Sequence, residues 1–142
     1  DLRKYLMHRE IGFGRKVLEI LENEGLSYEH IPSGIDDISV ILSEKGFDKS
    51  KEEIVTGRIK SELGVDEITV NRGLALIMLV GEGCRKTIGI ASRATAAFAR
   101  AGVNIEMINQ GSSEVSIMFG VKAEDSDKAV VSLYNEFFGK VG

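Results

Sequence analysis

A short glycine-containing turn in this sequence has the features of an anion-binding site. Gly12-Phe13-Gly14 precedes a stretch with apolar residues at helical spacing, namely Val17, Leu18, Ile20 and Leu21. The first N–H groups of a helix lack intrahelical acceptors and favour a negative charge, and glycine lets the backbone approach a ligand closely. The same residues also suit a plain strand-to-helix turn, so both interpretations stay open.

Residues around this turn could complete a site for a small polar molecule. The segment 7–10, which reads Met-His-Arg-Glu, leads into the turn and is placed to line its mouth. Tyr28 and Glu29 lie on a predicted strand that should pass close by. No general base pairs with a nucleophile in this set, so binding is favoured over catalysis.

Other stretches that partly match known binding or catalytic motifs do not complete a site. The stretch GEGCRKT (81–87) lacks the spacing of a phosphate-binding loop, and GFGRKV (12–17) is only a fragment of the dinucleotide fingerprint. His8 and His30 lie in different elements, and Cys84 has no histidine beside it in the sequence. We therefore expect no catalytic residue, no metal and no cofactor in this chain.

Composition limits the function further. The 142 residues are 43% hydrophobic and 28% charged, with a net charge of −4 and scattered cations, which is typical of a globular protein and argues against a nucleic-acid surface. The longest apolar run, 74–80, is too short to span a membrane, and the single cysteine fits a reducing cytoplasm. The composition predicts a cytoplasmic protein.

An internal repeat divides the chain into two similar modules. Residues 12–42 align without a gap on residues 89–119, at a constant offset of 77 residues. Identities fall at Gly12/Gly89, Gly25/Gly102, Glu29/Glu106, Ile31/Ile108, Gly34/Gly111 and Ser39/Ser116. Because this period has the size of a small domain, the sequence predicts two modules, 1–71 and 72–142.

Each module has the order expected of a ferredoxin-like β-α-β-β-α-β unit, in an α+β fold with antiparallel sheets and helices on one face. In the first module we expect strands at 2–7, 26–31, 38–42 and 67–70, and two helices. The first helix follows Gly14 and ends at Gly25. The second begins at a capping box of Ser50 and Glu53 and buries Ile54, Ile59 and Leu63.

The second module is predicted to be one strand short. We expect strands at 74–81, 103–108 and 114–121 and helices at 88–101 and 126–138. The last helix would bury Val130, Leu133, Tyr134, Phe137 and Phe138. The four residues after it are too few for a closing strand. That strand would come from upstream of residue 1 or from another subunit.

Three stretches carry a resemblance to a known family. The run VNIEMINQGSSEVSIMFGV (103–121), together with KYLMHREIGFGRKVLEILE (4–22) and LSYEHIPSGIDD (26–37), resembles the C-terminal regulatory region of aspartate kinases, a tandem pair of ACT domains. The resemblance covers essentially the whole chain and implies the same fold. It also implies that a kinase domain precedes residue 1 and that the first module is inserted in the second, whose last strand then comes from upstream.

The resemblance implies an allosteric sensor that binds lysine, threonine or both where ACT modules meet in a homodimer. Its contacts would come from Met7, Gly12, Phe13, Gly14, Tyr28 and Glu29, facing Asn104 and Ile105 of the other module. Glu29, Asp36 or Asp37 could balance the ammonium group of a lysine side chain. A threonine hydroxyl would instead need Asn104 or Gln110.

The turn between the last two strands, 109–113, is expected to act as scaffold first. Gly111 is predicted to have positive φ, and Ser112 and Ser113 to bond to local backbone. The first module has PSGIDD at the same place, which supports a structural role. Asn109 and Gln110 could still contact and support the residues that bind a ligand.

Two other functions remain as alternatives. A small enzyme on the same fold would need a converging nucleophile or anion clamp, for which only His8, Arg9 and Arg15 are available near one turn. A purely structural dimerisation module is the other alternative. An RNA-binding module is disfavoured, because the chain is acidic and its central strands offer only Phe119, predicted in the core.

Overall fold

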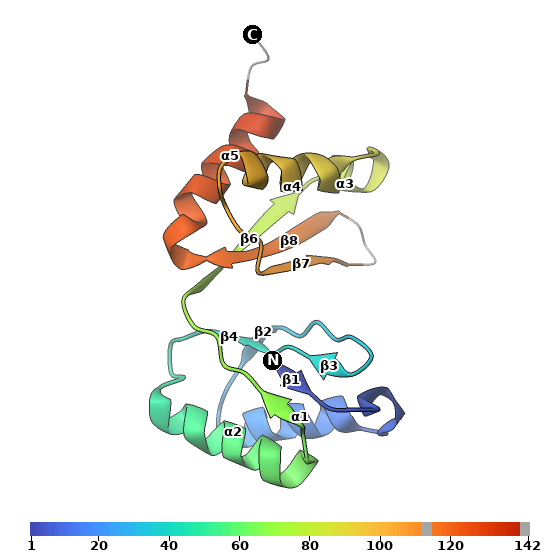
Figure 1. Ribbon diagram of the computed structural model, residues 1–142, viewed down its shortest axis with the longest axis vertical. Coiled ribbons are helices and arrows are strands. Elements are labelled where there is room, and N and C mark those ends of the chain that lie inside the picture. The colour runs from blue at the N-terminus through green and yellow to red at the C-terminus, as the bar shows by residue number, and fades with distance from the viewer. Residues whose placement is uncertain (112–114, 140–142) are drawn as a thin grey trace. The chain divides into compact units, whose positions relative to one another are not determined.

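The computed structural model describes residues 1–111 and 115–139, which form two compact units with separate hydrophobic cores, Asp1–Arg72 and Gly73–Gly142 (Figure 1). In the described part of the chain, no helix is both long enough and apolar enough to cross a membrane. Each unit combines an antiparallel sheet with helices, which confirms the predicted α+β ferredoxin-like fold.

The first unit follows the predicted order of elements, with shorter strands. Its elements are β1 (Leu2–Arg3), the 3-10 helix η1 (Met7–Arg9), α1 (Phe13–Asn23), β2 (Tyr28–His30), β3 (Asp37–Ile38), β4 (Ile41–Leu42), α2 (Lys49–Leu63) and β5 (Glu67–Ile68). Two ladders form, β3-β1-β5 and β2-β4. The strand predicted at 38–42 is split into β3 and β4, and each half joins a different ladder.

The first strand ends earlier than the predicted 2–7. Leu6 adopts a left-handed backbone with φ 59°, the only non-glycine residue in the described chain with positive φ, and η1 begins directly after it. A left-handed residue cannot continue a strand, because the extended conformation requires negative φ. The turn therefore starts at Lys4 and carries Met7 out of the sheet and into the core.

The two helices of this unit bury one stripe each. Helix α1 buries Val17, Ile20 and Leu21, as predicted. Helix α2 begins at Lys49 rather than at the predicted capping box, because the Asp48 carboxylate accepts the Lys51 N–H at 2.8 Å and already caps this end. It buries Val55, Ile59 and Leu63, so the predicted core position Ile54 was wrong and is exposed.

The second unit has a longer and more regular sheet. Its elements are β6 (Leu74–Val80), the short α3 (Glu82–Lys86), α4 (Ile90–Arg100), β7 (Met107–Gln110), β8 (Ser116–Lys122), the 3-10 helix η2 (Ala123–Asp125) and α5 (Ser126–Phe138). The strand order is β6-β8-β7, with Ile77 opposite Phe119 and Ile108 also opposite Phe119. Helices α4 and α5 cover one face of this sheet (Figure 1). No fourth strand joins it within the described residues.

The core of this unit lies between the sheet and the two helices. The rings of Phe98 and Phe119, both fully buried, meet edge to face with centroids 4.9 Å apart. Of the residues predicted to be buried on the last helix, Leu133 is buried and Phe137 packs against the core. Val130, Tyr134 and Phe138 are exposed, so these three predictions were wrong.

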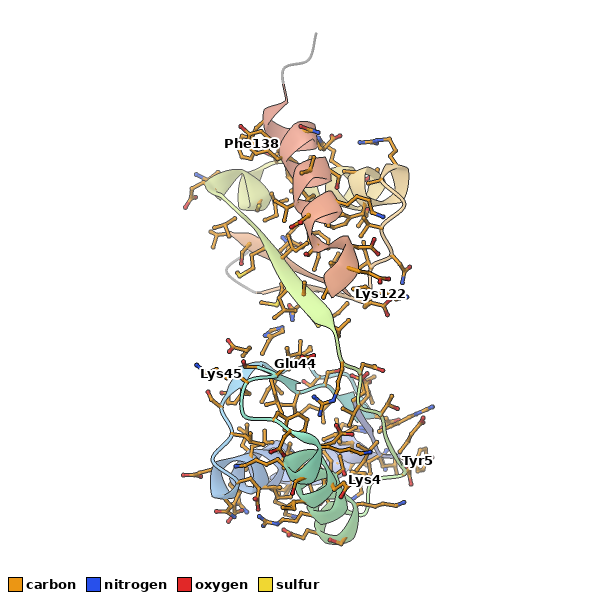
Figure 2. The ribbon with its side chains drawn as sticks, turned by 90° about the vertical axis from the view of Figure 1, so that its left-hand side faces the viewer. Lys4, Tyr5, Glu44, Lys45, Lys122 and Phe138 are labelled. Carbon is orange, nitrogen blue, oxygen red and sulfur yellow. The ribbon has the colours of Figure 1, made fainter. Side chains whose placement is uncertain are left out.

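The exposed residues of α5 share one side of the helix. Val130, Tyr134 and Phe138 recur every four residues and so lie along one side of the helix, each turned by about 100° or more from the buried Ala129. The rings of Tyr134 and Phe138 stack with centroids 5.4 Å apart, and Phe138 lies near the C-terminal end of the helix (Figure 2). The sequence pattern alone could not show which of two apolar stripes the sheet would cover.

We predict that replacing Phe98 by alanine destabilises the second unit by about 3–5 kcal/mol, because it removes a buried ring and leaves a cavity beside Phe119. Because the chain has no tryptophan, urea unfolding followed by far-ultraviolet circular dichroism measures the change in the free energy of unfolding. The control is Tyr134→Ala, which truncates a ring that is 61% exposed. Equal losses in the two variants would contradict this account of the core.

Candidate functional site

The predicted anion-binding turn of the first unit forms as a compact chain reversal. The 3-10 helix η1 ends at Arg9, and Gly12 then adopts a left-handed backbone with φ 78° and precedes the first residue of α1. The Phe13 N–H donates to the Glu10 carbonyl at 3.3 Å, and the Lys16 N–H donates to the Gly12 carbonyl at 3.0 Å. The next amides in this first turn, of Gly14 and Arg15, have no helical acceptor and can face an anion.

Two of the predicted contact residues use their side chains for the core. Met7 and Phe13 are buried among the apolar residues of the first unit. Their side chains therefore anchor the turn to the core, and Phe13 would contact a ligand only through its backbone. Gly12 has open space where a side chain would stand, with Arg15 Nε 3.9 Å from an ideal Cβ position, but its positive φ still disfavours any other residue.

The loop between β2 and β3 is tied to this turn. His8 donates its N–H to the Ile35 carbonyl at 3.2 Å, and its ring Nδ1 lies 3.3 Å from Asp36 Oδ1. The Lys4 N–H donates to the Asp36 carbonyl at 2.9 Å. The structure therefore brings the predicted residue Asp36 to the turn. Its carboxylate faces His8 there.

Glu10 does not simply line the mouth of the turn, as its place in the sequence suggested. Its carboxylate binds two ammonium groups, that of Lys4 in a very short contact and that of Lys16 at 3.1 Å. Hydrogen bonds from Lys4 and then Lys16 hold the pKa of Glu10 below its usual range. Lys4, Glu10 and Lys16 lie in different segments, after β1, after η1 and inside α1, so the pattern of no single element predicted this cluster.

Tyr28 and Glu29 are placed on β2 as predicted. Both side chains are exposed, and Tyr28 lies opposite Leu42 in the ladder with β4. They are thus available to a ligand at the surface of the first unit. Their part in a common site with the turn stays a prediction.

The predicted residues of the second unit occupy the segment that leads into β7. The Asn104 side chain donates to Glu106 Oε1 at 2.9 Å, Ile105 packs against the core, and Gln110 is exposed at the end of β7. Gly111 does not have the positive φ that was predicted for it. Ser112 and Ser113 lie outside the described residues.

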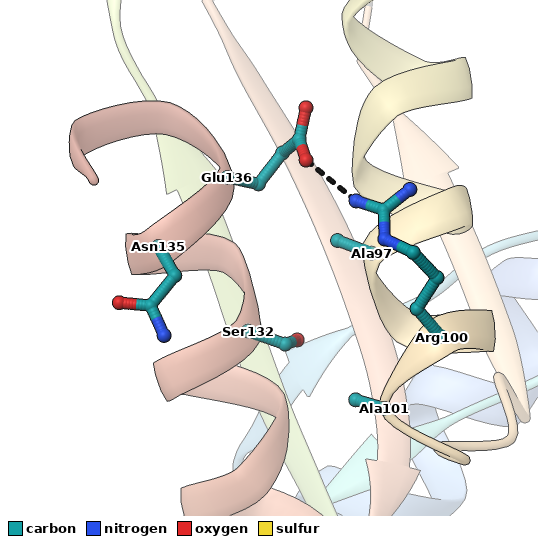
Figure 3. Close-up of a pocket in the computed structure, with 6 residues that line it drawn as sticks. All are labelled: Ala97, Arg100, Ala101, Ser132, Asn135 and Glu136. Atoms are coloured by element: carbon teal, nitrogen blue, oxygen red, sulfur yellow. Dashed lines mark hydrogen bonds and ion pairs between the residues drawn. The ribbon is translucent and has the colours of Figure 1, made fainter. Parts of the chain in front are cut away.

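A separate open cleft of about 350 Å³ lies between α4 and α5 in the second unit. Ala97, Arg100 and Ala101 line it from α4, and Ser132, Asn135 and Glu136 line it from α5 (Figure 3). None of the predicted effector-binding residues belongs to this set. Figure 3 shows that Arg100 reaches across the cleft to the Glu136 carboxylate.

Glu136 joins the two helices through two arginines. Arg100 Nη2 lies 2.6 Å from Glu136 Oε2, and Arg93 Nε lies 2.9 Å from Oε1. Arg93 also donates to the Glu136 carbonyl at 2.8 Å and stacks on the Phe137 ring. The hydrogen bond from Arg93 is the largest cause that holds the pKa of Glu136 below its usual range, with Arg100 adding to it. We interpret this cluster as a structural tie between α4 and α5.

Among the described residues, no group of three or more histidine, cysteine, aspartate or glutamate side chains is placed to hold a metal ion. The thiol of Cys84 lies 3.7 Å from the Leu79 carbonyl, near the core of the second unit.

Comparison with known proteins identifies relatives for nearly the whole chain. Residues 77–137 match the ACT domain family. Aspartokinase 3 of Bacillus subtilis is 56% identical over 140 residues, which are 99% of this chain and 31% of that protein. The crystal structure of Clostridium acetobutylicum aspartate kinase, described as an important allosteric enzyme, superposes with a TM-score of 0.89 at 42% identity over 96% of this chain and 31% of that one.

A further solved structure contains an amino acid. Aspartokinase III of Escherichia coli, in complex with lysine and aspartate in the T-state, matches with a TM-score of 0.72 at 26% identity, over 96% of this chain and 30% of that one. The chain thus spans about a third of the length of these relatives.

We predict that Glu136→Gln destabilises the second unit at neutral pH and not at low pH. A carboxylate whose folded-state pKa is lowered adds stability above its unfolded pKa, about 4.3 for glutamate, and loses it as the pH falls through the lower folded value. Urea unfolding of both proteins over a pH series from neutral to acid measures the difference.

The control for this experiment is Glu124→Gln, which removes an exposed carboxylate from the same unit. Its effect should be small at every pH. A Glu136→Gln effect that stayed constant down to strongly acid pH would contradict the role given to the two arginine pairs.

Proposed function

Since the chain is an allosteric regulatory ACT region of the aspartokinase family, we propose that it binds lysine, threonine or both and thereby transmits feedback inhibition to a kinase domain. In this proposal the chain carries no catalytic residues of its own and works as the regulatory part of a longer aspartate kinase. An effector need only change the equilibrium between two states by about 1–3 kcal/mol to control a distant site.

The observation that carries the proposal is the likeness to E. coli aspartokinase III, whose solved structure holds lysine and which aligns with 96% of this chain. The turn at 7–14 supports the proposal independently. It offers helix-start amides for a carboxylate, and Asp36, Asp37 and Glu29 supply negative charge in the same unit for ammonium groups. A free amino acid needs both kinds of partner.

Lysine and threonine make different demands on the site. The cationic tail of lysine would be balanced by Glu29, Asp36 or Asp37, whereas a threonine hydroxyl would bind an amide such as that of Asn104 or Gln110. In a homodimer, Asn104 and Ile105 of one module would face Met7, Gly12, Phe13, Gly14, Tyr28 and Glu29 of another. These residue roles rest on the likeness to the family and await measurement.

Self-association of the chain has support from one face of the second sheet. Leu74, Leu76, Met78 and Val80 alternate along β6 on the face opposite Ile77 and the core, and all four are exposed. Met118 lies directly opposite Met78 on β8. Contiguous apolar patches on a protein surface mark interaction sites, and a second copy of the same chain is the partner that this proposal requires.

The effector proposal predicts saturable heat when lysine or threonine is titrated into the chain in a calorimeter. Asn104→Ala should weaken the binding of the effector up to about ten-fold, the effect of losing one hydrogen bond, and leave the unfolding midpoint unchanged. Tighter binding of one amino acid in the presence of the other would indicate concerted inhibition. Unchanged affinity in the variant would remove Asn104 from the site, and no heat with either amino acid would overturn the proposed function.

The self-association proposal predicts that Met78→Lys weakens the homodimer at least ten-fold, because it places a charge in the centre of an apolar interface. Sedimentation over a range of protein concentrations measures the dissociation constant. The control is Val131→Lys, which adds the same charge at an exposed position of α5. A chain that is monomeric without either substitution would refute the dimer.

A further inference from the structure

The segment that joins the two units is short and exposed. Strand β5 ends at Ile68 and β6 begins at Leu74, and the residues between them, 69–73, are all exposed and belong to no helix or strand (Figure 1). The Thr69 N–H donates to the Asp1 carbonyl at 2.9 Å, which continues the pairing of β1 with β5 by one residue. An exposed connection of this kind between two cores is ordinarily a flexible linker.

Arg72, the last residue of the first unit, ties this segment back to its own unit. Its Nη2 and Nε lie 2.6 Å and 3.1 Å from the same carboxylate oxygen of Glu52. Its two terminal nitrogens each donate to the Phe47 carbonyl at 3.2 Å, and its guanidinium lies 5.4 Å from the centre of the Phe47 ring. We term Arg72, Glu52 and Phe47 the linker latch.

Both partners of Arg72 belong to firmly placed parts of the first unit. Phe47 packs against the hydrophobic core, and Glu52 lies in the first turn of α2, whose start is capped by Asp48. The guanidinium group presents its N–H donors in a rigid planar fork, so it can bind a carboxylate and a carbonyl at the same time. The side chain of Arg72 therefore fixes its backbone against the start of α2.

The next residue along the chain is held by the second unit. The Gly73 carbonyl accepts the Ala123 N–H at 2.7 Å, and Leu74 pairs with Lys122 at the start of the β6–β8 ladder. Gly73 has φ 70°, and an ideal Cβ there would meet open space, so glycine serves the backbone conformation and not a close approach. Two consecutive residues are thus bound to different units.

We propose that the linker latch is a reversible device that sets how freely the two units move relative to each other. While the latch is closed, the flexible part of the junction is limited to the bonds around Gly73. When Arg72 leaves Glu52 and Phe47, residues 70–72 become free as well, and each adds two soft dihedral angles to the linker. This inference goes beyond the effector proposal and does not depend on it.

The latch can open without disturbing either core. The side chains of Arg72 and Glu52 are 42% and 27% exposed, and ion pairs at such positions are weak and screened by salt. Opening requires rotation of the Arg72 side chain and the exposed backbone beside it, while Phe47 keeps its place against the core. The closed and open states therefore differ by a small free energy, as a switchable contact requires.

The test is cleavage of the whole chain by trypsin, which must take the Arg72 guanidinium into its own acidic specificity pocket before it can cut between Arg72 and Gly73. Cleavage at this bond therefore reports the open latch. We expect it to be about two- to five-fold faster in Glu52→Gln than in the unsubstituted protein. Mass spectrometry of the fragments 1–72 and 73–142 at early times measures the rate.

The matched control is Glu53→Gln, which removes an exposed carboxylate from the next position of the same helix, and its cleavage rate should be unchanged. Equal rates in Glu52→Gln and the unsubstituted protein would overturn the latch. Equal acceleration in both variants would also overturn it, because that result would mean that the start of α2 had loosened in general.

A second measurement follows the linker backbone directly by nuclear magnetic resonance relaxation. In the unsubstituted protein the amide order parameters of residues 70–72 should match those of β5, at about 0.85, and in Arg72→Gln they should fall below about 0.6 with those of α2 unchanged. Arg72→Lys should lie between the two, because an ammonium group lacks the planar fork. Equal order parameters in the unsubstituted protein and Arg72→Gln, whether high or low, would show that Arg72 does not hold the linker.

Discussion

The left-handed glycine at the start of the first helix is the constraint on which each unit depends. At Gly12 and Gly89 the backbone takes positive φ, which a residue with a Cβ adopts only at a cost. The chain reverses there so abruptly that a fully exposed isoleucine is followed two positions later by a buried apolar residue, Phe13 or Ile90. Without this reversal the helix could not lie back across the sheet, and neither core could form.

Around this shared constraint the two units have acquired different electrostatics. In the first, a carboxylate sits between two ammonium groups beside the turn. In the second, the carboxylate of Glu136 sits between two guanidinium groups on the outside of α4 and α5. In both clusters one carboxylate binds two cations. The first cluster links residues on either side of a turn, and the second links a pair of helices.

The fold also explains why so much apolar surface stays open. A ferredoxin-like unit places both helices on one face of its sheet, so the other face has no cover within the unit. On β6 this produces a row of exposed leucine, methionine and valine side chains, and α5 separately exposes Tyr134 and Phe138. A domain of about 70 residues has a small core, so leaving these apolar side chains in water is unfavourable for it. Association, with another copy or with other parts of a longer chain, is the physical outcome that this pattern favours.

The sequence by itself determined the repeat, the order of the four long helices α1, α2, α4 and α5 among the strands, the two glycine turns and the family, because these follow from local periodicity, backbone preference and residue-by-residue likeness; it did not predict the short α3 or the split of 38–42 into β3 and β4. It also located α5 from end to end. It could not determine which apolar stripe of α5 meets the sheet, that β1 stops at Arg3, or that Asp48 rather than Ser50 caps α2, since each choice depends on what lies alongside. Only the tertiary structure decided that Lys4, Glu10 and Lys16 meet. These residues belong to no common helix or strand, and their charges come together only when the chain has folded back on itself.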